Sequence, residues 1–154
     1  PIEITSWKKI DMMWLKAAIK EFLVANHARG GDLLPTSRNV DVFLRLGFAG
    51  AERGDPCLVA VVGGEPVGFV LWAGGPASLD SRWRTINALG SYTMPGARSK
   101  GVAAALRARA WSEAKSLGYE RVIGPIHTSN DRGAQEFIQV FNAWPTTWQF
   151  EALL

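Results

Sequence analysis

The sequence contains a single cysteine, Cys57, and only two histidines, which leaves few residues for disulfide or zinc chemistry. One cysteine cannot form a disulfide within the chain, and no group of Cys and His has the spacing of a zinc site. We therefore expect no bound metal. Cys57 opens a predicted strand, where a thiol usually acts as a small buried hydrophobic side chain.

Long apolar runs and long basic runs are also missing. No stretch of 18 apolar residues and no charged-then-apolar leader occurs in the chain, which argues against a membrane span and a signal peptide. We accordingly expect a cytoplasmic protein. The net charge is +3, but no run of five Lys or Arg residues is present, so nucleic acid is not the expected partner. A mildly basic chain suits a small polyanionic ligand instead.

A chain of 154 residues that is 47% hydrophobic is long enough to bury its own core, and we expect one domain over residues 1–154. Gly90 lies inside one predicted strand, where glycine marks a bulge or a close approach of the backbone. Apolar spacing, turn residues and caps predict strands at 2–6, 57–62, 64–72, 84–93, 121–127 and 148–154, and helices at 12–27, from 35 onward, at 102–117 and from 130 or 131 to 141. This order predicts an α/β fold, in which helices flank a mixed sheet.

The turn formed by residues 98–101, Arg-Ser-Lys-Gly, joins a long predicted strand to a long predicted helix. The first N–H groups of a helix have no partners within the helix, and its dipole places partial positive charge at the same end. Arg98 and Lys100 add full charges, Ser99 adds a hydroxyl, and Gly101 allows an anion to approach the backbone. These features predict a phosphate-binding turn.

In this setting the chain resembles the GNAT superfamily of acyl-CoA-dependent N-acyltransferases. The core of the family signature, Arg-x-x-Gly-x-Ala, is intact at Arg98, Gly101 and Ala103, and Thr93 and Pro95 stand at two further signature positions. The resemblance covers residues 57–141 well and the N-terminal helices by their order. It implies a mostly antiparallel mixed sheet with splayed middle strands, flanked by helices, and acetyl-CoA as co-substrate.

By this resemblance, backbone amides from Arg98 to Ala103 would hold the pyrophosphate of CoA. The strand edge from Tyr92 to Met94 would pair with the pantetheine arm, and Asn130 would reach that arm as well. A backbone N–H near Thr93 or Met94 would polarise the thioester carbonyl. The cofactor-binding candidates are therefore Tyr92, Thr93, Met94, Arg98, Ser99, Lys100, Gly101, Val102, Ala103 and Asn130.

Two residues that the family commonly uses for proton transfer are not where the resemblance would place them. Phe137 stands where relatives often have a tyrosine acid, and the strand at 84–93 has no carboxylate to act as a base. Because direct transfer requires the amine to attack as a free base, other groups become candidates. His127 as base or water relay and Tyr92 as substitute acid are the catalytic candidates, with Ser91 and Asp80 also near.

The acceptor side suggests a small-molecule or peptide amine. Few acidic residues occur in the segments that would form the acceptor site, which favours an apolar or aromatic amine over a polycation. The candidate wall residues are Phe43, Phe48, Trp72, Trp83 and Trp144. The expected activity is direct transfer of acetyl to a primary amine, and the alternative is a catalytically impaired acyl-CoA sensor or regulatory module. Only one clear strand is expected after the last helix, so a second is either missing or supplied by the other subunit of a homodimer.

Overall fold

The computed structural model describes residues 1–31, 33–74, 84–125, 144–145 and 149–154. Two helices begin where the sequence places their caps. α1 (Met12–Ala28) begins after Asp11, whose side chain accepts a hydrogen bond from the Met13 N–H. α2 (Ser37–Glu52) begins after Thr36, whose side chain accepts from the Asn39 N–H. Each side chain satisfies one of the N–H groups that a helix leaves unpaired at its start.

Within the described ranges, seven strands form one sheet in the order β1-β2-β3-β4-β5-β7-β6. Every neighbouring pair is antiparallel except β4 and β5, which run parallel. The sheet is therefore mixed and mostly antiparallel, as predicted. The elements are β1 (Glu3–Ser6), the 3₁₀ turn η1 (Trp7–Lys9), α1, α2, β2 (Cys57–Val62), β3 (Glu65–Gly74), β4 (Thr85–Thr93), the 3₁₀ turn η2 (Pro95–Ala97), α3 (Val102–Ser116), β5 (Arg121–Pro125), β6 (Trp144–Pro145) and β7 (Gln149–Leu153).

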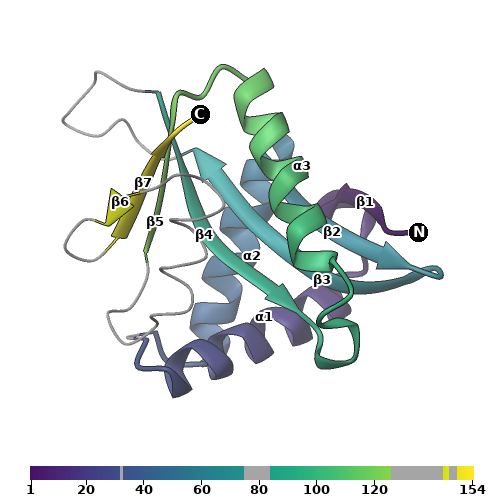
Figure 1. Ribbon diagram of the computed structural model, residues 1–154. Coiled ribbons are helices and arrows are strands. Elements are labelled where there is room, and N and C mark those ends of the chain that lie inside the picture. Colours follow the sequence, from purple (N-terminus) through teal and green to yellow (C-terminus); the bar gives the residue numbers. More distant parts are fainter. Residues whose placement is uncertain (32, 75–83, 126–143, 146–148) are drawn as a thin grey trace.

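Helices cover both faces of the sheet, with α3 in front and α2 behind in the view of Figure 1. Because side chains alternate along a strand, consecutive residues of β2 and β3 enter different cores. Leu58 and Val70 pack with the α3 residues Leu106 and Ala110. The next residue along each strand, Val59 and Leu71, packs with α1 and α2.

β4 contains the irregularity that its glycine predicted. Leu71 of β3 pairs with Gly90 while Trp72 pairs with Ala88, so Leu89 is an extra residue in β4. A Cβ on Gly90 would lie 3.3 Å from the Phe22 ring of α1, so the helix packs directly against the backbone here. A bulge of this kind bends the strand at that point.

The middle strands splay apart, as the resemblance implied. Among the described residues, β4 pairs with β5 only over Thr85–Asn87 and Arg121–Ile123. β4 then continues to Thr93, while Gly124 and Pro125 of β5 pair with β7 alone. Figure 1 shows the two strands diverging from their common end. We call the edge of β4 beyond Asn87, where β5 is no longer paired with it in the described residues, the β4–β5 gap.

The expectation of a single strand after the last helix is wrong. β6 is a second strand of two residues, Trp144–Pro145, that pairs with β7 at the edge of the sheet. Two residues carry too little periodicity to be recognised in a sequence. The argument for a strand supplied by another subunit, and with it for a homodimer, loses its support. The predicted helix from 130 or 131 to 141 lies outside the described residues.

Asp55 joins several elements at the end of the sheet where β3 finishes. Its side chain is 3% exposed and accepts from three donors: the Tyr119 hydroxyl at 2.7 Å, the Gly74 N–H at 3.0 Å and the Arg53 guanidinium at 3.1 Å. Burial, together with the Asp55 hydrogen bond and charge, raises the pKa of Tyr119 to about 12. This carboxylate thus connects the segment after α2 to β3 and to the loop before β5.

Candidate functional site

The N-terminus of α3 differs from those of the other two helices described. Gly101 occupies the N-cap position at φ +81°, no side chain caps the helix, and its first turn contains no acidic residue. Unlike α1 and α2, this helix therefore leaves its first N–H groups without a side-chain oxygen. Such an end is suited to an external anion.

The backbone before Gly101 is held in an uncommon conformation. Ser99 has φ +63°, which makes it the one non-glycine residue with positive φ in the described part of the chain. Left-handed backbone is unfavourable for a residue with a Cβ, and such residues are concentrated at functional sites. Alternation of left- and right-handed residues turns successive N–H groups toward one point, which forms an anion-binding concavity.

Buried neighbours hold this turn in place on the sheet. Ala97 and Val102 are 8% and 2% exposed and belong to the core beneath α3. The Met94 N–H donates to the Val67 carbonyl at 2.8 Å, and the Ala97 N–H donates to the Met94 carbonyl. The turn is therefore anchored at both ends, while Ser99 and Lys100 between them are exposed.

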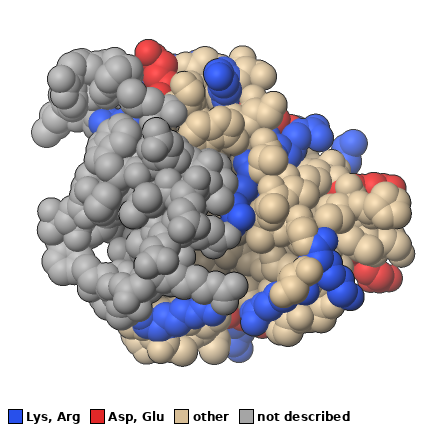
Figure 2. Space-filling model, in the orientation of Figure 1, with Lys and Arg blue, Asp and Glu red and all other residues tan. Residues whose placement is uncertain are grey.

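Arg98 lies beside the end of β4. Its Nε donates to the Thr93 carbonyl at 3.1 Å, and its guanidinium carbon lies 5.7 Å from the centre of the Tyr92 ring. The face in Figure 2 shows basic side chains at several separate places among its described residues, not as one continuous patch.

The backbone of β4 presents particular N–H groups to the β4–β5 gap. The Met94 N–H donates to β3. In an antiparallel pair of strands, the N–H groups of successive residues point alternately toward the partner strand and away from it. The N–H groups of Ser91 and Thr93 therefore point away from β3. Of the two residues predicted to polarise a carbonyl, Met94 has its N–H committed within the sheet. Thr93 remains a candidate, and the Ser91 N–H, which the sequence interpretation did not single out, faces the same side.

Tyr92 points to the α1 and α2 side of the sheet, where its hydroxyl donates to Glu21 Oε2 at 2.6 Å. Burial is the main cause that raises the pKa of Tyr92, the hydrogen bond and charge of Glu21 add to it, and Arg98 opposes it. A phenol that retains its proton more strongly is a weaker acid than a free tyrosine. The hydroxyl is bonded to Glu21, and the acid role of Tyr92 stays a prediction.

Glu21 was not among the predicted site residues. It lies 71 positions from Tyr92 in the sequence, on the polar side of α1, and no motif connects the two. Only the packing of α1 against β4 brings this carboxylate to the strand, which has none of its own. The missing carboxylate could not have been found by inspecting β4.

The described side chains of the predicted acceptor wall pack in or against the two cores. Trp72 is 2% exposed and lies in the core under α3, so its assignment to an acceptor pocket is corrected to a core role. Its position follows from strand alternation, which turns it away from α1 and α2. Phe43 is 7% exposed and packs against Phe22, with ring centres 5.7 Å apart. Phe48 makes an edge contact with the Trp7 ring.

Several predicted residues cannot be placed. His127, Asn130, Trp83, Asp80 and Phe137 lie outside the described residues, and Trp144 is described only as part of β6. Their roles stay predictions. The structure thus brings together the turn at 98–103, the end of β4 and Glu21.

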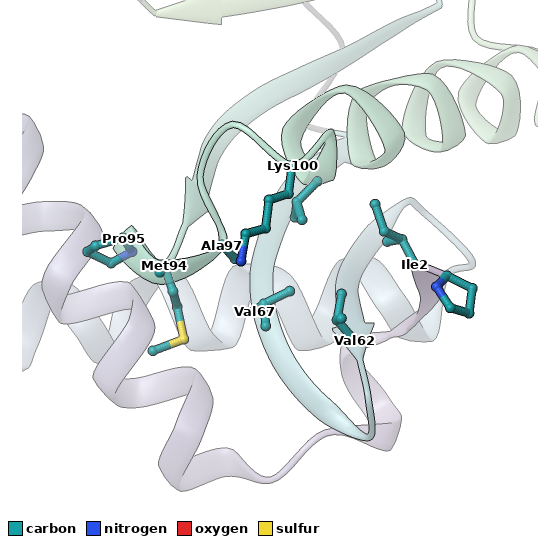
Figure 3. A pocket seen from close by; sticks show the side chains of 10 residues that line it. Ile2, Val62, Val67, Met94, Pro95, Ala97 and Lys100 are labelled. Atoms are coloured by element: carbon teal, nitrogen blue, oxygen red, sulfur yellow. The ribbon is translucent and has the colours of Figure 1, made fainter.

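A cavity of about 480 Å³ lies beside the turn, on the side of β2 and β3. Figure 3 shows Lys100 extending along it from the turn, with apolar side chains on the other walls. Apolar walls with a single cation do not by themselves specify a ligand. The lining residues are Pro1, Ile2, Val62, Val67, Met94, Pro95, Gly96, Ala97, Lys100 and Val102.

Cys57 is fully buried, as predicted, and its thiol contacts the Trp72 carbonyl. Burial, and next the charge of Asp55, raises its pKa to about 12, so the thiol is not nucleophilic near neutral pH. The described residues contain no group of three His, Cys, Asp or Glu side chains that could hold a metal ion. Their helices include none with the length and hydropathy of a membrane span.

The chain matches the family model described as the acetyltransferase (GNAT) family over residues 17–142. Comparison with curated protein sequences finds no match.

Solved structures of similar fold cover nearly the whole chain. An N-acetyltransferase from Staphylococcus aureus Mu50 is 21% identical, with a TM-score of 0.64 over 99% of this chain and 96% of the other. The PaiA N-acetyltransferase of Thermoplasma acidophilum, solved with coenzyme A, is 16% identical, with a TM-score of 0.67 over 100% and 99%. The polyamine N-acetyltransferase of Drosophila melanogaster, which forms N-acetylagmatine, is 11% identical, with a TM-score of 0.68 over 100% of both. At these identities the likeness shows the fold.

Proposed function

Since the chain belongs to the acetyltransferase (GNAT) family, we propose that it binds acetyl-CoA at the turn 98–103 and transfers the acetyl group directly to a primary amine. The observation that supports this most is the N-terminus of α3. It is the one α-helix start in the described residues without a side-chain cap, and it follows a left-handed Ser99 and Gly101. A pyrophosphate would supply the acceptor oxygens that Asp11 and Thr36 supply for α1 and α2.

The β4–β5 gap suits the pantetheine arm. The N–H groups of Ser91 and Thr93 face this gap, so an extended chain of amides can pair with β4 as an added strand does. Asn130, predicted to contact the same arm, follows β5 in the sequence. This placement would bring the thioester to the bulged part of β4.

The chain's own groups then serve the transfer in two ways. The Ser91 or Thr93 N–H would stabilise negative charge on the carbonyl oxygen, because backbone donors fixed in a strand need no reorganisation during the reaction. Holding both substrates in the gap would supply a further part of the acceleration. The CoA thiolate would leave without help from Tyr92, whose hydroxyl proton is donated to Glu21.

We expect the acceptor to be a small molecule or peptide whose amine is attached to an apolar or aromatic body. The half-buried Phe22 and the buried Phe43 lie against the bulge at Gly90, so the surroundings of β4 are apolar where the acetyl group would lie. His127 remains a candidate for a water relay to the amine.

Coenzyme A binding tests the first step, with Gly101→Ala compared with Gly54→Ala. Both glycines have similar positive φ values, +81° and +85°, and a Cβ at either position meets nothing within 4 Å. The two substitutions therefore impose similar backbone strain. Titration calorimetry with CoA should show about tenfold weaker binding for Gly101→Ala, since about 1–2 kcal/mol of strain acts on the turn itself. Gly54→Ala should bind as the wild type does.

Catalysis is tested by mass spectrometry of acetyl-CoA incubated with benzylamine, phenethylamine and a peptide with a free amino terminus. Acetylated product from the wild type supports the transferase. Tight CoA binding without product from any amine would favour the alternative, an acyl-CoA sensor. Equal CoA affinity of the wild type and Gly101→Ala would contradict the placement of the pyrophosphate.

A further inference from the structure

We propose that Glu21, held in position by Tyr92, binds the ammonium group of the acceptor and removes its proton before attack. This inference rests on the proposed function and assigns an acceptor-side residue to it. Glu21 is supplied by α1, while β4 itself has no carboxylate between Thr85 and Thr93.

The contact that positions Glu21 is specific. The Tyr92 hydroxyl donates to Glu21 Oε2 at 2.6 Å, a short distance typical of a hydroxyl bonded to an ionised carboxylate. Tyr92 is only 9% exposed and is packed in the core formed by α1, α2 and the sheet. A rigid buried phenol thereby holds one oxygen of an exposed glutamate that otherwise has three freely rotating side-chain bonds.

Glu21 and Tyr92 lie beside the β4–β5 gap, where the acetyl group is proposed to bind. The Thr93 carbonyl is turned away from β3, and Arg98 bonds to it from the gap side of β4. Arg98 also lies 5.7 Å from the Tyr92 ring, so the ring is next to this edge of the strand. Glu21 consequently stands on the α1 side of the strand end that borders the gap. An acceptor entering from this side meets the carboxylate before it reaches β4.

The Glu21 carboxylate can accept more hydrogen bonds than Tyr92 supplies, so it can also bind a ligand. An ionised carboxylate can accept about four hydrogen bonds. Within the described residues, Tyr92 is the one side chain bonded to it, and the glutamate is exposed. The further charged group that acts on Tyr92 is Arg98, which opposes the rise in the Tyr92 pKa and lies over its ring. An incoming ammonium group would complete the coordination of Glu21 and be oriented toward the gap.

The proposed step balances as follows. The acceptor ammonium gives one proton to Glu21, directly or through one water, and becomes a neutral amine. The nitrogen lone pair forms the C–N bond to the acetyl carbon, the C–S bond breaks, and its electron pair leaves with the sulfur. The remaining extra proton on nitrogen passes to the thiolate through solvent, and Glu21 releases its proton to water. The products are the acetylated amine, CoA and one proton.

The test compares Glu21→Gln with the wild type, using acetyl-CoA and whichever probe amine (benzylamine, phenethylamine or the peptide) the wild type turns over. At neutral pH, kcat/KM for the amine should fall about 100-fold, within the range for loss of a general base. The KM for acetyl-CoA should be unchanged because the turn at 98–103 is intact. The deficit should shrink as the pH approaches the pKa of the free amine, since the amine then loses its proton without help.

Two further variants separate this role from a structural one. Tyr92→Phe should reduce kcat/KM about tenfold, since the carboxylate remains but is no longer held. Glu65→Gln removes another exposed carboxylate, on β3, and should leave both KM values and kcat unchanged.

The outcomes distinguish the two proposals. Wild-type turnover with unchanged kcat/KM in Glu21→Gln overturns the role of Glu21 and leaves the transferase in place. A pH-independent loss in Glu21→Gln also overturns proton removal. A wild type that binds CoA but acetylates no amine overturns the proposed function, and the role of Glu21 with it.

Discussion

The two tyrosines of the chain each donate a hydrogen bond to a carboxylate, but they do so in opposite surroundings. Tyr119 bonds to Asp55 at 2.7 Å, and the Asp55 side chain is 3% exposed and has two further donors. Tyr92 bonds to Glu21 at 2.6 Å, and Glu21 is exposed on α1. The distances are nearly equal, so the difference lies in what surrounds each carboxylate.

A carboxylate whose donors all come from the chain itself contributes to the fold. Removing Asp55 would leave the Gly74 N–H and the Tyr119 hydroxyl, both half-buried, without the acceptor that the fold supplies, which costs stability. Glu21 lies in water, and its second oxygen is available to a ligand. The same pair of chemical groups therefore serves stability at one end of the sheet and is free to serve substrate binding at the other.

The largest expected difference between the pairs is in stability. Asp55→Ala should lower the free energy of unfolding by about 3 kcal/mol or more, because three donors lose their acceptor at a buried site. Glu21→Ala should change it by no more than about 0.5 kcal/mol, as is usual for an exposed position. Urea denaturation measures both. A similar loss in the two variants would mean that both carboxylates are structural.

A smaller difference in stability between the two pairs is expected when each tyrosine loses its hydroxyl. Tyr119→Phe should cost about 1–2 kcal/mol, because Asp55 keeps its charge but loses one donor in a buried position. Tyr92→Phe should cost less than about 1 kcal/mol, since water can replace the phenol at Glu21. Thermal unfolding of both variants under the same conditions provides the comparison. A larger loss for Tyr92→Phe would contradict it.

The smallest expected difference between the two pairs is in how protein stability changes at alkaline pH. The pKa of Tyr119 is raised to about 12, and that of Tyr92 is raised from its usual value near 10. Absorbance titration of Tyr92→Phe, which leaves only Tyr119, should show a midpoint near pH 12. The folded protein retains a proton that the unfolded chain loses near pH 10, so this contribution to stability is complete below pH 10 and disappears as the pH rises toward 12. In Tyr119→Phe the stability should fall less steeply over this interval.

Much of the fold followed from local patterns. Asp11 and Thr36 mark helix starts, the Gly63-Gly64 pair closes the hairpin, and Gly90 coincides with a bulge, because caps, turns and bulges depend on neighbouring residues. The predictions were wrong where a strand was too short to show a periodicity, and where a tryptophan could belong either to the core or to a pocket. β6 is only two residues long, and Trp72, a candidate for the acceptor wall, is buried in the core under α3.

For the site, the sequence by itself determined the turn at 98–103, since its glycine, its two cations and the following helix are contiguous. It also indicated the family through that same motif. Only the tertiary structure decided which N–H groups of β4 face the gap, because that depends on the register with β3. Only the packing of α1 against β4 joined Glu21 to Tyr92 across 71 residues. A turn is encoded by adjacent residues, whereas a carboxylate brought from another element is encoded by the whole core that positions the helix.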